Sequence, residues 1–156
     1  MDLKELYQNV EENLGKEIEL KGWIRNHRKQ KEFGFIDFSD GTCFKRIQLV
    51  YDNKLENFEE IQKYHNGSAI TAGGLLIKSE GAGQDYEVKV TKIVLEGDCP
   101  EDYPMQPKRH SSEFLREQAY LRPRTNLFQA VFRIRSVTAM AIHTYFQERG
   151  YVYFHA

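Results

Sequence analysis

Short runs in which apolar and polar residues alternate fill much of the first two thirds of the chain, and such alternation is typical of half-buried β-strands. The runs cover residues 17–28, 33–38, 45–51, 69–78 and 86–95. A segment with helical spacing, residues 57–64, lies between the third and fourth runs. This order is the layout of the OB-fold, a small β-barrel, because a β-sandwich would need more strands and a parallel α/β sheet a helix after each strand. We therefore predict an all-β OB-fold barrel of five strands.

A helix precedes the barrel in the predicted order. Asp2 and Glu5 have the spacing of a capping box, and Gly15 is a typical helix end. Apolar residues recur between them at helical spacing, namely Leu3, Leu6, Val10 and Leu14. The pattern predicts one amphipathic N-terminal helix.

The periodic pattern stops at residues 97–112, which hold three of the four prolines of the chain. This composition predicts a hinge or linker. Beyond it we expect a short helix over residues 113–121, a long amphipathic helix over residues 126–149 capped by Thr125 or Asn126, and the first residues of a strand over 151–154.

One long helix and one strand cannot close a core of their own. Either the chain continues into a larger domain, or the helix packs against the barrel or against a second copy of the chain. We predict three parts: a barrel domain over residues 1–96, a hinge over 97–112, and the beginning of a second domain over 113–156.

Alternation also predicts which side chains of the second and third strands point out of the barrel. Ile36 and Phe38 form the core pair of the second strand, so Phe33 and Phe35 face outward. The aliphatic side of the third strand faces the core, which leaves Gln48 outside. In the first strand the same rule turns one set of residues inward, namely Ile18, Leu20 and Ile24, and another set outward, namely Lys21, Trp23 and Arg25. Gly22 is the candidate position for a β-bulge in this strand.

Charge is unevenly placed along a chain that is nearly neutral overall. The 156 residues are 40% hydrophobic and 29% charged with a net charge of −1, which excludes a disordered tail and a polycation. Any nucleic-acid partner must therefore bind a local patch. Residues 21–31 contain no acid and a row of cations, namely Lys21, Arg25, Arg28, Lys29 and Lys31. A second basic stretch covers residues 108–124.

The outward pair Phe33 and Phe35 lies near Gln48 and the cations of the first strand in the predicted barrel. Unpaired bases stack on aromatic rings for about 1–3 kcal/mol each, and cations contact the phosphates. A glutamine amide both donates and accepts hydrogen bonds, so it can read a base edge. This set predicts binding of single-stranded nucleic acid. The alternative is that the two phenylalanines pack under the N-terminal helix.

Other candidate chemistry is weaker. The glycine-rich residues 80–84 join two strands and lack the lysine of a P-loop, so we interpret them as a hairpin turn. Asp37 and Asp40 are interpreted as turn residues. Cys43 and Cys99 are far apart without CxxC spacing and the histidines are scattered, so we predict no metal site and no disulfide. We find no catalytic pair of nucleophile and base and no apolar run that spans a membrane.

A resemblance to a known family lies in residues 103–133, which read YPMQPKRHSSEFLREQAYLRPRTNLFQAVFR. They resemble bacterial-type asparaginyl-tRNA synthetases, and the run LRPRTN favours asparagine over the aspartyl and lysyl relatives. Two barrel segments are similar to the anticodon-binding OB domain of this class II subgroup, and they read GWIRNHRKQKEFGFIDFSDGT and RIQLVYD. The resemblance covers essentially the whole chain.

This resemblance implies an OB domain, a hinge and an antiparallel α+β catalytic domain. Residues 132–154 would be the first class II motif, a long helix and strand that build a homodimer interface. The motifs that hold ATP, its Mg²⁺ ions and the amino acid would lie beyond Ala156. The chain is thus expected to be the N-terminal part of a cytoplasmic asparagine–tRNA ligase that uses ATP and Mg²⁺. By itself it would need no cofactor, contain no catalytic residue and be inactive.

Individual positions match residues of the family that contact the tRNA(Asn) anticodon loop, the implied partner. Phe35 matches the aromatic residue that stacks on the central uridine of the anticodon. Arg28 matches a basic residue that contacts the anticodon, and Gln48 matches an amide that reads a base edge. Possible contacts to the tRNA backbone are Arg25, Lys29, Lys108 and Arg109.

Three alternatives stay open at this point. The chain could be the N-terminal part of an aspartate–tRNA ligase, which is the related family with the most similar barrel. It could be a stand-alone OB module that binds single-stranded nucleic acid and dimerises through its helix. It could also be an interaction protein whose exposed helix, residues 127–145, docks a partner.

Overall fold

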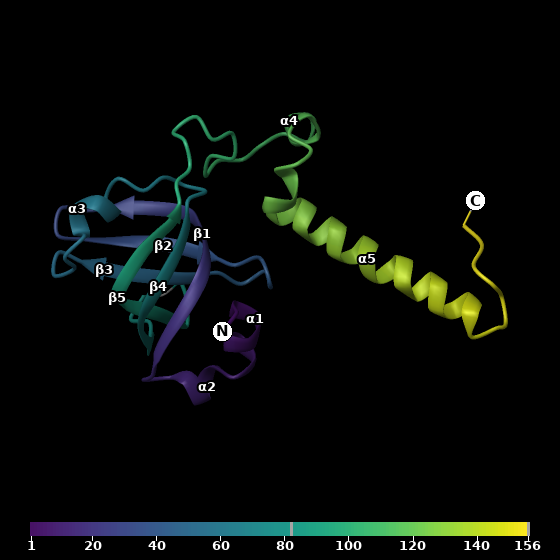
Figure 1. Ribbon diagram of the computed structural model, residues 1–156, viewed down its shortest axis with the longest axis horizontal. Helices are drawn as coiled ribbons and strands as arrows, with labels where there is room; N and C mark the ends of the chain where they lie inside the picture. Colours follow the sequence, from purple (N-terminus) through teal and green to yellow (C-terminus); the bar gives the residue numbers. More distant parts are fainter. Residues whose placement is uncertain (82, 156) are drawn as a thin grey trace. The chain divides into compact units, whose positions relative to one another are not determined.

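The computed structural model describes residues 1–81 and 83–155 (Figure 1). The chain divides into two compact units, Met1–Lys108 and Arg109–Ala156. Residues 97–108, which the sequence places in the hinge, group with the barrel in this division. The domain boundaries expected from the sequence, after residues 96 and 112, stay a prediction.

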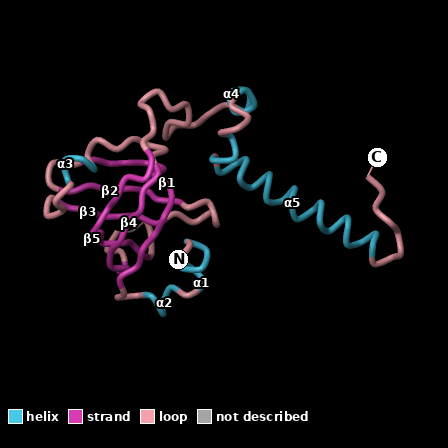
Figure 2. The backbone as a smooth tube through the Cα atoms, in the orientation of Figure 1, coloured by secondary structure: helices cyan, strands magenta, loops and turns pink. Residues whose placement is uncertain are grey.

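The described residues form five strands in the first unit, β1 (Glu17–Lys29), β2 (Phe33–Ser39), β3 (Ile47–Asp52), β4 (Ala69–Lys78) and β5 (Tyr86–Gly97). The strands close in the order β1-β2-β3-β5-β4, and Figure 2 shows them wrapped around one interior. β3 and β5 are parallel, whereas the other neighbours are antiparallel. α3 (Phe58–Ile61) connects β3 to β4 and is shorter than the helix expected there. The predicted OB-fold barrel is confirmed.

The barrel interior is filled by the side chains that alternation predicts to face inward. Ile36, Phe38 and Leu49 are fully buried, and the side chains of Leu20 and Ile24 in β1 are only 1% exposed. Burial of a large aliphatic or aromatic side chain contributes roughly 1.5–3 kcal/mol. The inward and outward faces of β2 and β3 are therefore as predicted.

The N-terminal segment folds as two short helices, α1 (Leu3–Gln8) and α2 (Val10–Asn13), rather than as the single helix expected. The predicted cap is present, because the Asp2 carboxylate accepts a hydrogen bond from the Glu5 N–H at 2.7 Å. The helix breaks at Asn9, where φ is −126° and the side-chain amide donates to the Glu5 carbonyl at 3.2 Å. Asparagine competes with the helical backbone in this way.

The loop after β2 holds the beginning of α1. The Asp40 carboxylate accepts from the Leu3 N–H at 2.6 Å and from the Thr42 N–H at 2.9 Å, so Asp40 is a turn residue as predicted. The Thr42 hydroxyl accepts from the Lys4 N–H at 3.1 Å. These bonds fix α1 where Leu3 and Leu6 are fully buried in the barrel core.

A β-bulge interrupts β1, but the prediction that Gly22 forms it is wrong. Gly22 pairs with β4 in continuous register. The register with β2 shifts instead between Ile24 and Asn26, so Arg25 is the extra residue. Gly22 is required for another reason, since a Cβ there would lie 2.7 Å from the Ser39 carbonyl oxygen.

His27 follows the bulge and points toward the core. Its Nδ1 lies 3.2 Å from the Tyr64 carbonyl oxygen and its Nε2 lies 2.7 Å from the Tyr51 hydroxyl. Because the carbonyl can only accept, Nδ1 carries the proton and the Tyr51 hydroxyl donates to Nε2. Burial lowers the pKa of His27 to about 4 and raises the pKa of Tyr51 to about 12. Both groups are therefore neutral at pH 7, as the hydrogen bonds require.

The second unit contains α4 (Ser112–Glu117), a 3₁₀ turn (Arg122–Arg124) and α5 (Asn126–Gln147). The Thr125 hydroxyl accepts from the Phe128 N–H at 3.4 Å, which confirms Thr125 as the cap of α5. The expected strand over residues 151–154 is wrong, since the described part of this unit offers no other strand with which it could pair.

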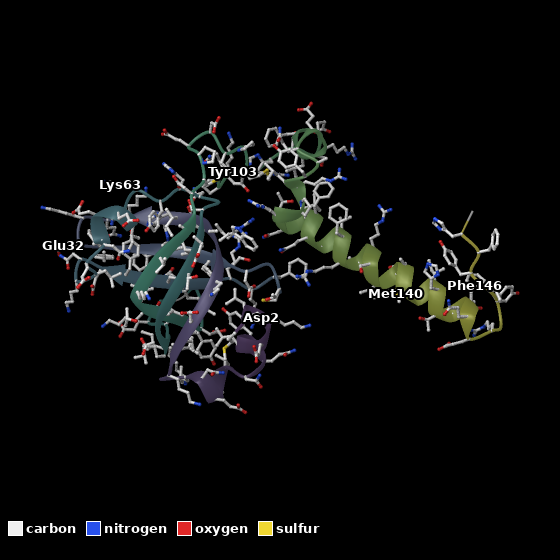
Figure 3. All side chains as sticks on the ribbon, viewed as in Figure 1. Asp2, Glu32, Lys63, Tyr103, Met140 and Phe146 are labelled. Atoms are coloured by element: carbon white, nitrogen blue, oxygen red, sulfur yellow. The ribbon has the colours of Figure 1, made fainter. Side chains whose placement is uncertain are left out.

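α5 exposes large apolar side chains, and Figure 3 labels Met140 among them. The exposed set includes Val131, Ile134, Val137, Met140 and Ile142. In the part of the chain that the structure describes, no helix combines the length and apolar character needed to cross a bilayer.

We expect Gly34→Ala to destabilise the barrel by about 1–3 kcal/mol, as overpacking does in a dense core. A Cβ at Gly34 would overlap the ring and hydroxyl of Tyr51 and so disturb the bond to His27. Urea unfolding of the whole chain measures the effect. Gly83→Ala is the matched control, because a Cβ there would meet nothing within 4 Å. Equal stability of the two variants would contradict the packing argument.

We expect the free energy of unfolding to fall as the pH decreases from 6.5 to 4. The unfolded chain takes up a proton at His27 near the ordinary pKa of 6.5, whereas the folded barrel does so only at about 4, so acid favours the unfolded state across this window. The loss is at most about 3 kcal/mol, at roughly 1.4 kcal/mol per pKa unit. Urea titrations at several pH values measure it. The His27→Gln variant should show a flatter profile, and an equally steep one would assign the effect to other groups.

Candidate nucleic-acid interface

The bulge at Arg25 decides which side chains of β1 reach the outer face of the barrel. Uninterrupted alternation from Ile24 would turn Arg28 inward, with the other even-numbered residues. The extra residue reverses the order, so that His27 pairs with the buried Ile36 and Arg28 pairs with Phe35. Directly opposed residues of an antiparallel pair share a face. Arg28 and Phe35 therefore lie together on the outside of the sheet.

Arg28 links the stacking residue to the amide. Its guanidinium carbon lies 5.1 Å from the centroid of the Phe35 ring, and its Nη2 donates to Gln48 Oε1 at 2.6 Å. A guanidinium only donates, so this bond fixes the orientation of the amide, with Oε1 toward Arg28. Alternation selected Phe35 and Gln48, the family resemblance added Arg28, and the structure brings the three together on β1, β2 and β3.

The aromatic pair faces outward, as predicted. Phe33 is 38% exposed and Phe35 is partly buried. Their ring centroids are 5.4 Å apart and the ring planes meet at 87°, which is an edge-to-face contact. The alternative in which the pair packs under the N-terminal helix is not the observed arrangement, because α1 inserts Leu3 and Leu6 into the core instead.

Two carboxylates border these residues, and neither of them was assigned a role in binding from the sequence. Asp37 lies within β2, so its interpretation as a turn residue is wrong; its Oδ1 is 3.9 Å from Arg28 Nη2. Glu87 lies beside Gln48 in the parallel register of β3 and β5. Its Oε2 accepts from the Ser79 hydroxyl at 2.8 Å and from Gln84 Nε2 at 3.1 Å. Period-two alternation puts Asp37 on the outer side of β2 with Phe33 and Phe35, but only the barrel closure reveals Glu87.

The remaining basic candidates are spread along the chain. Arg25 is the bulge residue and is partly buried, and Lys29 is exposed at the end of β1. Lys108 ends the first unit and Arg109 begins the second, and both are exposed. Trp23 points outward, as predicted, and is 40% exposed. Among the described side chains, no cluster of histidine, cysteine and carboxylate groups could hold a metal ion.

The outer face therefore combines four kinds of group within a small area. Aromatic rings can stack on bases, and the Arg28 guanidinium can donate to base carbonyls or phosphates. The Gln48 amide can donate and accept, whereas Asp37 and Glu87 only accept when ionised. Such a surface suits unpaired bases more than a bare phosphate backbone, which carboxylates repel.

The chain matches one protein-family model and is similar to curated proteins. Residues 18–96 match the tRNA anticodon family model, described as an OB-fold nucleic acid binding domain. The asparagine–tRNA ligase of Acetivibrio thermocellus is 54% identical over 154 residues, which are 98% of this chain and 33% of that protein. The asparagine–tRNA ligase of Desulfitobacterium hafniense is 50% identical over 153 residues, with the same two shares. The chain thus spans about a third of the length of these curated relatives.

Solved structures show the same fold. The asparaginyl-tRNA synthetase of Pyrococcus horikoshii is 25% identical with a TM-score of 0.76, over 91% of this chain and 35% of that one. The aspartyl-tRNA synthetase of Entamoeba histolytica is 18% identical with a TM-score of 0.81, over 97% of this chain and 38% of that one. At this identity the likeness shows only that the two proteins share the fold. Both curated relatives are asparagine–tRNA ligases, not aspartate–tRNA ligases or stand-alone OB modules. Because the family model spans more than half of its residues, the chain belongs to the tRNA anticodon family of OB-fold nucleic acid binding domains.

Proposed function

We propose that this chain binds the anticodon loop of tRNA(Asn) and is the N-terminal part of an asparagine–tRNA ligase. The observation that carries the proposal is the contact of Arg28 with both Phe35 and Gln48 on the outer face of the barrel. The arrangement places a stacking ring, a base-reading amide and a cation next to one another. An unpaired base needs these three kinds of contact for recognition.

In the proposed complex, Phe35 stacks on the central uridine of the anticodon. Uracil presents two carbonyl oxygens and one N–H group at its edges. The Gln48 amide nitrogen, turned away from Arg28 by the bond at Oε1, donates to one carbonyl oxygen. Arg28 retains further N–H donors for the same base or for a neighbouring phosphate. Glu87, beside Gln48, can accept from the N–H groups of an adjacent base.

The cations at the edges of the face have a different role. Arg25 and Lys29 are proposed to contact phosphates of the loop, and Lys108 and Arg109 to contact the tRNA backbone farther from the anticodon. Such contacts position the RNA without reading its sequence, and their contribution decreases with added salt.

The complete enzyme is proposed to activate asparagine with ATP and Mg²⁺ and to transfer it to tRNA(Asn) in the cytoplasm. The site for this chemistry is proposed to lie in the part of such ligases that this chain does not cover. Homodimerisation is proposed to occur through α5. Its exposed apolar side chains, among them Ile134 at 67% and Val137 at 70%, would be removed from water in a dimer.

We expect Phe35→Ala to weaken binding of a tRNA(Asn) anticodon hairpin by about 1–3 kcal/mol, because the stacking surface is lost. Fluorescence anisotropy with a labelled hairpin measures the affinity. Phe35→Tyr keeps the ring and should bind almost as well as the wild type. Unchanged affinity of the alanine variant would remove the stacking role. Equal wild-type affinity for the hairpin and for unrelated single strands would favour a general single-strand binder.

We expect Gln48→Met to weaken the cognate hairpin by about 1–3 kcal/mol and to affect a hairpin with cytidine at the central position much less. Methionine preserves the length of the side chain but neither donates nor accepts as an amide does, and cytosine replaces the uracil carbonyl with an amino group. The same anisotropy assay with both hairpins gives the difference. Equal losses on the two RNAs would show that Gln48 does not read the base.

A further inference from the structure

Phe33 is an outward aromatic residue. It has no role in the proposed function, in which Phe35, Gln48 and Arg28 contact a single base. It begins β2, lies two residues before Phe35 on the same face, and is 38% exposed. The residue between them, Gly34, faces the core against Tyr51. The packing of Gly34 against Tyr51 therefore fixes the position of Phe33 on the outer face. The Phe33 side chain itself contributes little to the core.

The geometry of the two rings separates their stacking surfaces. The planes of Phe33 and Phe35 meet at 87°, so one flat base cannot lie parallel to both. Same-face positions two residues apart on a strand are separated by roughly 6.7 Å. That spacing is about twice the rise of about 3.4 Å between stacked nucleotides of one strand. Two neighbouring bases could occupy the two rings only if they were unstacked from each other, as bases in recognised RNA loops are.

The surroundings of Phe33 favour stacking over charge as its contribution. Across the sheet it is opposite Asp52 of β3, and the loop before it contains Lys31 and Glu32, of which Figure 3 labels Glu32. The Asn53 N–H donates to the Glu32 carbonyl at 2.9 Å, so the two loops at this end of the barrel are joined. Acidic and lysine side chains are mixed at this end of the barrel, so together they do not produce a strong positive potential.

We propose that Phe33 is a second stacking platform, which holds a base next to the one on Phe35. The interface then takes two consecutive splayed nucleotides along β2 rather than one. This inference rests on the proposed anticodon binding. It adds a specificity-determining residue, because RNA in which the neighbouring base cannot leave the stack would bind less tightly.

The test compares Phe33→Ala and Phe35→Ala in the whole chain. Three anticodon hairpins are used: the intact one and two in which either base flanking the central uridine is replaced by an abasic site. On the intact hairpin, Phe33→Ala should raise the Kd about 5- to 150-fold. On one of the two abasic hairpins Phe33→Ala should leave the Kd almost unchanged, because the base that stacks on Phe33 is already missing from that RNA. The loss should be similar at low and high salt, unlike losses from lysine substitutions.

Two results would overturn the inference. An unchanged Kd for Phe33→Ala on the intact hairpin would show that the ring binds no base. A loss of equal size on both abasic hairpins would show that Phe33 acts by supporting the Phe35 ring through their edge-to-face contact. Phe44→Ala is the control for an exposed aromatic residue in the loop beyond the other end of β2, and it should leave the Kd unchanged.

Phe35→Ala separates this inference from the proposed function. If Phe35→Ala weakens binding and Phe33→Ala does not, only the second platform is rejected. If the wild-type chain fails to bind the hairpin, or if Phe35→Ala has no effect, the proposed function itself fails. A hairpin with 2-aminopurine at the position that removes the Phe33 effect provides a spectroscopic check, because its fluorescence should rise when the wild type unstacks it from the neighbouring base and should rise less with Phe33→Ala.

Discussion

The outer face of this barrel depends on one extra residue in β1. The bulge at Arg25 turns His27 toward the core and Arg28 toward Phe35. Placing an imidazole in the core is costly unless both nitrogens are hydrogen-bonded, and the Tyr64 carbonyl and Tyr51 hydroxyl provide the two partners. The bulge, the buried hydrogen bonds and the position of the guanidinium are consequently one structural unit. A strand without the bulge would bury Arg28, and among the residues that the structure describes no carboxylate is buried in the barrel to balance its charge.

The same unit prepares the face for binding. The side chain of a free surface arginine loses about 2 kcal/mol of rotamer entropy when it is immobilised. Here the 2.6 Å bond to Gln48 and the contact with Phe35 restrict the side chain in the RNA-free protein. Part of the ordering cost of association is thus met during folding, which favours affinity. The bond also orients the amide, because the guanidinium only donates and therefore requires the amide oxygen, not the amide nitrogen, on the side facing Arg28.

Period-two alternation correctly predicted the barrel, its buried set and the outward Phe33, Phe35 and Gln48, because each strand has one buried face. It failed where the geometry is not periodic or not local. The bulge lies at Arg25 rather than Gly22, and the position of Glu87 follows from the parallel closure of β3 and β5, which joins residues distant in sequence. The strand expected near the C-terminal end did not form, because β-strands are stabilised by partners and not by composition alone.

The charge on the face determines how RNA would approach it. A chain with a net charge of −1 gains little from general attraction to phosphate. Asp37 and Glu87 on the face itself oppose a phosphate there, while they can accept hydrogen bonds from base N–H groups. A loop that binds must therefore turn its bases toward the sheet and keep its backbone toward the cations at the edges. Affinity on such a surface comes mainly from stacking and hydrogen bonds, so it depends on bases that are unpaired, which is the condition that distinguishes an anticodon loop from a duplex.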